Sequence, residues 1–106
     1  MPKYLIQASY IGEGVQALRQ EGGSARRQAV ERAVSSVGGT LECLYFSFGE
    51  SDVVLIMDVP DHTAAAGVAL SAGASGKVDV KTTVLLTPEE IDTAVKVGVD
   101  YRSPGS

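Results

Sequence analysis

The feature that most constrains the fold is a pair of apolar segments, residues 40–48 and 52–59, separated by a short polar break. The break, Gly-Glu-Ser-Asp at residues 49–52, is too short for a crossover, so the segments should pair as an antiparallel hairpin. We place the turn at Glu50 and Ser51, although a longer turn would change the register. This turn predicts three cross-strand pairs on the core face: Phe48 with Val53, Phe46 with Leu55, and Leu44 with Met57.

The flanking segments supply two more strands and two helices. Residues 3–10 and 77–86 alternate between apolar and polar side chains, which predicts strands. Residues 24–37 predict a helix with Ser24 as its N-cap and an apolar stripe along one face. Asp61 is the predicted N-cap of a second helix, which is rich in Ala and Gly. Its small side chains would allow this helix to approach the sheet closely.

The order of these elements predicts the fold class. A β-α-β-β-α-β order is the ferredoxin-like α+β sandwich. Residues 15–20 can add a short helical turn. A last helix should begin at Thr87, with Glu90 placed for a capping box. We expect one domain over residues 1–97 and a C-terminal tail over residues 98–106.

In this fold the helices cover one face of the sheet and leave the other face open. The open face is expected to carry apolar side chains: Leu5, Leu41, Val54, Ile56 and Leu85. Such a patch needs a partner, so we expect the chain to pack against itself as a homodimer or larger oligomer. An apolar cavity with a few polar groups is typical of small-molecule sites. The sequence therefore predicts these ligand-binding residues: Gln7, Ser9, Tyr45, Asp52, Asp58, Lys81 and Thr83. The alternative is that they hydrogen-bond across the interface between two copies.

Composition argues against several classes of function. The 106-residue chain has a net charge of −4 and no basic stripe, so a nucleic-acid partner is not expected. Cys43 is the single cysteine and His62 the single histidine, which leaves no ligand set for a zinc cluster. The first ten residues lack the charged start and the long apolar region that are typical of a signal peptide, and no apolar run reaches membrane-spanning length. We therefore expect a cytoplasmic protein without a cofactor, a metal or a membrane partner.

Three stretches carry a resemblance to a known family: MPKYLIQASY, GGTLECLYFSFGESDVVLIMDVPD and KTTVLLTPEE. They resemble the GYD-domain proteins, a group of small, mostly bacterial proteins without an established activity. Gly49 and Asp52 align with the namesake motif, whereas Ser51 stands where the motif has tyrosine. The family looks like part of the dimeric α+β-barrel group, which includes ligand-sensing domains and cofactor-free oxygenases. This resemblance implies the dimeric form of the fold, and it decides no reaction.

Three classes of function remain open. The first is an oligomeric small-molecule-binding or sensing module that uses a pocket between sheet faces. The second is a cofactor-free oxygenase or isomerase in the same pocket, which needs an acid–base pair such as Asp52 or Asp58 beside Tyr45 or Lys81. The third is a structural assembly unit without a ligand. The sequence does not decide whether the chain is an enzyme, and it assigns no catalytic residue.

Overall fold

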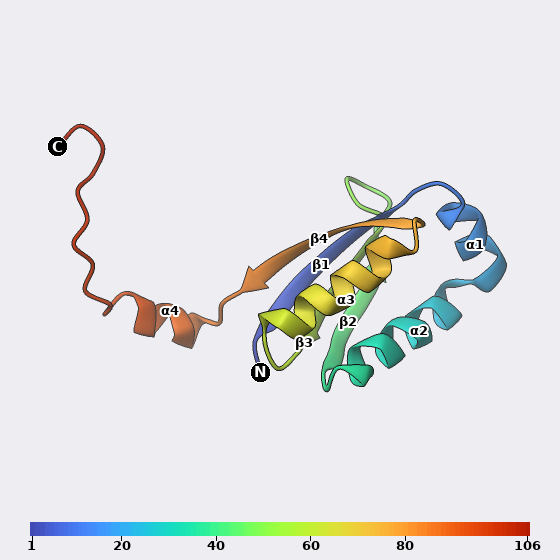
Figure 1. The fold of residues 1–106 in the computed structure, drawn as a ribbon, viewed down its shortest axis with the longest axis horizontal. Coiled ribbons are helices and arrows are strands. Elements are labelled where there is room, and N and C mark those ends of the chain that lie inside the picture. The colour runs from blue at the N-terminus through green and yellow to red at the C-terminus, as the bar shows by residue number, and fades with distance from the viewer.

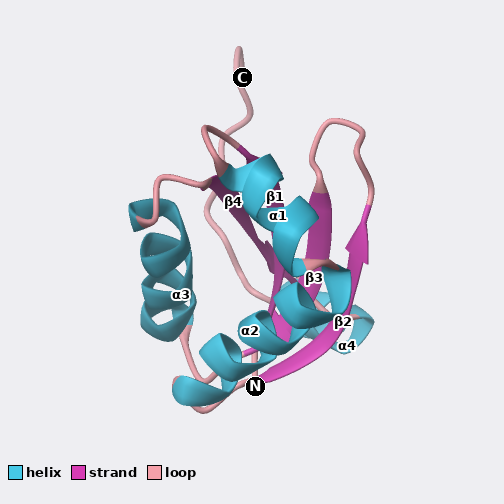
Figure 2. Cartoon of the chain, turned by 90° about the vertical axis from the view of Figure 1, so that its right-hand side faces the viewer, coloured by secondary structure: helices cyan, strands magenta, loops and turns pink.

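A computed structural model describes all 106 residues and has a four-stranded antiparallel sheet in the order β2-β3-β1-β4. Three helices lie on one side of this sheet, and a fourth stands apart from it (Figures 1 and 2). The elements in chain order are β1 (Lys3–Tyr10), α1 (Gly14–Glu21), α2 (Gly23–Ser36), β2 (Thr40–Phe46), β3 (Val53–Asp58), α3 (His62–Ala74), β4 (Val78–Leu85) and α4 (Pro88–Ala94). The α+β class and the element order of the ferredoxin-like sandwich are as the sequence predicts.

The helix ends follow local chemistry, with one exception. The Asp61 carboxylate accepts a hydrogen bond from the Ala64 N–H at 2.8 Å and caps α3. Thr87 and Glu90 form a reciprocal capping box at the start of α4. The predicted Ser24 cap of α2 is wrong: the N-cap is Gly22, which offers no side-chain acceptor.

The predicted register of the central hairpin is also wrong. In the structure Phe46 pairs with Val53 and Leu44 pairs with Leu55, a shift of two residues. A shift of two keeps both residues on the core face, because side chains alternate along a strand. The loop covers residues 47–52, so it is longer than the two-residue turn that we expected. Phe48 lies in this loop with φ at 52° and is 64% exposed, so it does not reach the core.

A β-bulge in β2 changes the face of one further residue. The register between β2 and β3 shifts between Leu41 and Cys43, and Leu41 lies opposite Met57. Leu41 therefore packs against the core, and its expected place on the open face is wrong. Glu42, the extra residue, is exposed. Bulges of this kind insert one residue and re-aim its neighbours.

The core lies between the sheet and the helices. Its buried residues come from β1, α2, β3, the connection after β3 and the start of α3: Tyr4, Ile6, Val34, Leu55, Met57, Val59 and Ala65. The largest fully buried side chains are those of Met57, Val34 and Val59. These residues fix α2 and the N-terminal end of α3 on the sheet.

Gly14 fixes α1 at one end of the sheet. A Cβ atom at this position would clash with the Lys77 backbone carbonyl, which also accepts a hydrogen bond from the Ile11 N–H at 2.9 Å. Only glycine permits this approach. The first turn of α1 is therefore held against the chain that enters β4.

The chain after β4 leaves the sandwich. Figure 1 shows α4 and the C-terminus standing away from the sheet and the other helices. All residues from Pro88 to Ser106 are exposed, and they include Ile91, Val95, Val97 and Tyr101. None of the helices combines the length and the apolar character needed to cross a membrane.

Candidate functional site

The open sheet face carries most of the residues that the sequence predicts for a ligand site. Leu5 lies between Ile56 on β3 and Thr83 on β4. Gln7 lies between Val54 and Lys81 in the next row of the sheet. Tyr45 extends that row on β2, opposite Val54, and is 70% exposed. The face thus has an apolar centre with polar groups around it.

Asp52 and Asp58 are engaged in structural contacts. The Asp52 carboxylate accepts a hydrogen bond from the Tyr10 N–H at 2.8 Å, and the Asp52 N–H donates to the Ala8 carbonyl at 2.8 Å. Asp58 pairs with Lys3 across the strands at 3.0 Å, and Lys3 also contacts Glu42. The carboxylates of Glu42 and Asp58 raise the pKa of Lys3, and the hydrogen bond to Glu42 is the largest cause.

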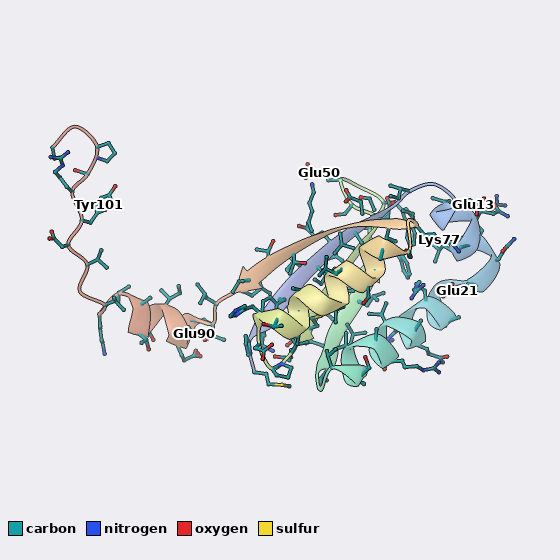
Figure 3. All side chains as sticks on the ribbon, in the orientation of Figure 1. Glu13, Glu21, Glu50, Lys77, Glu90 and Tyr101 are labelled. Carbon is teal, nitrogen blue, oxygen red and sulfur yellow. The ribbon has the colours of Figure 1, made fainter.

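Gln7, Ser9 and Lys81 line a polar hollow of about 120 Å³ on this face. Its other lining residues are Glu50, Ser51 and Asp79, so the hairpin loop forms its rim. Figure 3 shows Glu50 at the outer end of this loop. Ligand pockets are commonly about 300–1,000 Å³, so the hollow of one chain is too small to enclose an organic molecule. Tyr45 and Thr83 do not line it.

A larger cleft lies on the other side of the sheet, beneath the helices. Its volume is about 610 Å³, and 18 of its 26 lining residues are hydrophobic. The floor consists of core-face residues of the strands, such as Ile6, Leu55 and Val80, and the walls come from α1, α2 and α3. The size and the apolar lining match those of small-molecule sites.

The composition of α3 keeps this cleft open. Its only leucine, Leu70, is 73% exposed and contributes nothing to the interior. The residues of α3 that line the cleft are small: Gly67, Val68, Ala69, Ser71 and Ala72. Only Ala65, near the start of the helix, is buried. Since Leu70 faces solvent and the side chains of α3 that line the cleft are short, the space toward α2 stays open and a cleft remains between the two helices.

Polar groups gather where α1 meets the cleft. Tyr10 ends β1, Arg26 lies in the first turns of α2, and Glu21 ends α1. The Arg26 Nε lies 3.8 Å from the Glu21 Oε1, a contact too long for a hydrogen bond. Lys77 lines the cleft at the end of the α3–β4 connection. Figure 3 shows Glu21 and Lys77 at the same end of the molecule, beside α1.

Burial and the neighbouring charges shift the pKa of the Tyr10 phenol. Burial raises the pKa of Tyr10 above its usual value of 10.0. The neighbouring Arg26 acts to lower this pKa, whereas Glu21 and Asp52 act to raise it. The hydroxyl therefore stays protonated at neutral pH and can donate a hydrogen bond into the cleft.

The sequence predictions did not single out the cleft or its polar end. The helical pattern of residues 24–37 leaves Arg26 outside the apolar stripe, and strand alternation assigns Tyr10 to the core face, so neither pattern marks a site. The available signal was the run of small residues in α3, which we interpreted as a close approach to the sheet. No group of three or more His, Cys, Asp and Glu side chains is placed to hold a metal ion.

The family model described as the GYD domain matches residues 4–95, which is most of the chain. This range includes all of the sheet except Lys3, together with the cleft and α4. A search of curated protein sequences finds no match to this chain.

Proposed function

This chain belongs to the GYD-domain family, and from its fold we propose that it is a small-molecule-binding or sensing module that works as a homo-oligomer. The observation that carries the proposal is the cleft of about 610 Å³ between α2, α3 and the sheet. In a protein with a purely structural role we would expect side chains to fill an apolar space of this size, because filling it would add stability.

The lining of the cleft favours binding over catalysis. The sequence interpretation required Asp52 or Asp58 beside Tyr45 or Lys81 for an enzyme. Both carboxylates are instead engaged, by the Tyr10 N–H and by Lys3. Apart from the core tyrosine Tyr4, every buried residue is apolar, and no charged residue is buried. Strongly perturbed, buried acid–base groups are the usual mark of a catalytic site.

The open face of the sheet supports the oligomeric part of the proposal. Leu5, Val54 and Ile56 are neighbours on this face and are only half-buried in a single chain. A two-fold axis through this patch would bring it against the same patch of a second copy. The polar hollow at Gln7, Ser9 and Lys81 would then lie between sheet faces, where the sequence led us to expect a ligand. It is the second candidate location, and the cleft is the first.

Native mass spectrometry of freshly purified protein tests this function. We expect an oligomer that carries a small molecule in part of the population. Gly67→Leu places a large side chain in the cleft, and Gly73→Leu makes the same change in α3 away from it. A Cβ at either glycine meets no atom within 4 Å, so both variants should fold.

We expect Gly67→Leu to lose the bound mass and Gly73→Leu to retain it. If both variants retain the bound mass, the ligand does not lie in the cleft. A bound mass that Gly67→Leu retains and Lys81→Ala loses would place the ligand between the sheet faces instead. Wild-type protein that carries no small molecule and binds neither octanoate nor 1-octanol would contradict the binding function itself.

A further inference from the structure

Three donor groups at the α1 end of the cleft have no hydrogen-bond partner for their side chains. The hydrogen bonds of Tyr10 and Lys77 involve only their backbone groups, which leaves the phenol and the ammonium group free. The guanidinium of Arg26 has only the 3.8 Å contact with Glu21. Lys3, in contrast, has both Glu42 and Asp58 as partners.

The balance of charge at this end favours an anion. Arg26 and Lys77 supply two positive charges to the lining of the cleft, and Glu21 supplies one negative charge. Asp52 acts on the Tyr10 phenol from outside the lining, where its carboxylate accepts the hydrogen bond of the Tyr10 N–H. Away from this end the lining is largely apolar and includes Val30, Leu44 and Val68. A planar guanidinium with free N–H groups matches a carboxylate in a two-bond arrangement.

We infer that the cleft takes an amphipathic carboxylate, with its apolar body between α2 and α3 and its carboxylate on Arg26. The Tyr10 hydroxyl is the second donor, and Lys77 adds positive charge at the mouth. The ligand carboxylate displaces that of Glu21 from its loose contact with the guanidinium. This inference rests on the proposed function and adds the chemical class of the ligand. A cationic ligand would meet Arg26 and Lys77 with Glu21 as the only carboxylate of the lining, so it is disfavoured.

Isothermal titration calorimetry with octanoate and 1-octanol tests the inference, because the two probes share an apolar chain and differ in charge. We expect wild-type protein to bind octanoate at least about tenfold more tightly than 1-octanol, as charge-assisted hydrogen bonds allow. Arg26→Gln should remove most of this preference and leave the affinity for 1-octanol unchanged. Arg32→Gln, which removes an exposed arginine of α2 outside the cleft, should keep the preference.

Each other outcome overturns a definite part of the inference. Equal affinity of wild-type protein for both probes would refute the carboxylate class and leave binding in the cleft intact. A preference for octanoate that persists in Arg26→Gln would refute the role of Arg26 as the carboxylate partner. A preference that persists in Gly67→Leu would refute the location of the site in the cleft. Binding of either probe only after removal of residues 96–106 would assign the cleft to the C-terminal segment of a second copy. Absence of binding by every form would refute the inference, and it would refute the proposed function as well where the purified protein carries no bound molecule.

Discussion

The carboxylate of Asp52 accepts a hydrogen bond from the backbone N–H of Tyr10 at 2.8 Å. This contact joins the residue before β3 to the last residue of β1, beyond the last strand pair between β1 and β3. Tyr10 in turn lines the polar end of the cleft. The residue of the GYD-like motif that we expected to bind a ligand on the open face therefore supports a residue on the opposite side of the sheet.

Replacing Asp52 with alanine should reduce the free energy of unfolding by about 1–2 kcal/mol, because it removes a hydrogen bond to a charged, half-buried acceptor. Urea denaturation measures this change. Asp79→Ala is the matched control, since Asp79 is exposed and should change stability by less than about 0.5 kcal/mol. Equal effects of the two substitutions would show that the Asp52 contact is not a structural one.

Gly39 should not tolerate a side chain, whereas Gly73 should. A Cβ at Gly39 would clash with the Asp58 carbonyl and lie 2.7 Å from the Val59 Cγ1. We expect Gly39→Ala to destabilise the fold by about 1–3 kcal/mol through overpacking. Gly73→Ala should stabilise it by about 0.5–1 kcal/mol, because alanine favours the helix and the site is open. Thermal unfolding of both variants checks the sign, and a stabilised Gly39→Ala would be inconsistent with this packing.

The phenol of Tyr10 should ionise at a higher pH than a free tyrosine. Its pKa is raised in the folded state, chiefly by burial, so the folded protein holds this proton more tightly than the unfolded chain does. The stability that results is fully present below pH 10 and is lost as the pH rises through the folded-state pKa.

Absorbance at about 295 nm, followed against pH for wild type and Tyr10→Phe, isolates this titration as a difference curve. We expect its midpoint above the ordinary value of 10.0 for tyrosine. Stability at alkaline pH should also fall more steeply in wild type than in Tyr10→Phe. A midpoint at or below the ordinary value would mean that the cleft end is open to water.

A charge at the centre of the open face should disrupt the proposed oligomer. Val54 lies between Gln7 and Tyr45 on that face and is half-buried in one chain. We expect Val54→Asp to raise the dissociation constant by more than about tenfold, because an unpaired carboxylate would be buried between the two copies. Gln28→Asp adds the same charge to an exposed position of α2 and should leave the assembly unchanged. Light scattering after size exclusion compares them, and an unaltered Val54→Asp oligomer would rule out packing through this face.

The sequence predicted those parts of the fold that depend on local chemistry. The caps at Asp61 and Thr87 depend on side chains only three residues from their partners, and both were confirmed. The hairpin register failed because residues 47–52 form a loop. In this loop the Ser47 hydroxyl bonds the Ser51 carbonyl at 2.7 Å and Phe48 takes a positive φ. Phenylalanine rarely adopts that conformation, so nothing in the sequence signalled it.

The cleft could not be predicted for a different reason. Its existence depends on the distance between α2 and α3, which is set by buried contacts from Val34 and Ala65 to strands far away in sequence. The small residues of α3 are equally compatible with close packing on the sheet and with an empty space beside it. The residues predicted on the open face, such as Gln7 and Thr83, follow from strand alternation alone, and their role in binding stays a prediction.

The central claim is that the ligand lies beneath the helices rather than against the open face. Methyl NMR spectra recorded during titration with octanoate test it directly, because both faces of β3 carry methyl groups. We predict large shifts for Leu55 and for Val30 and Val68 across the cleft, and little change for Val54 and Ile56. Shifts confined to Val54, Ile56 and Leu5 would contradict the account and place the ligand on the open face of the sheet.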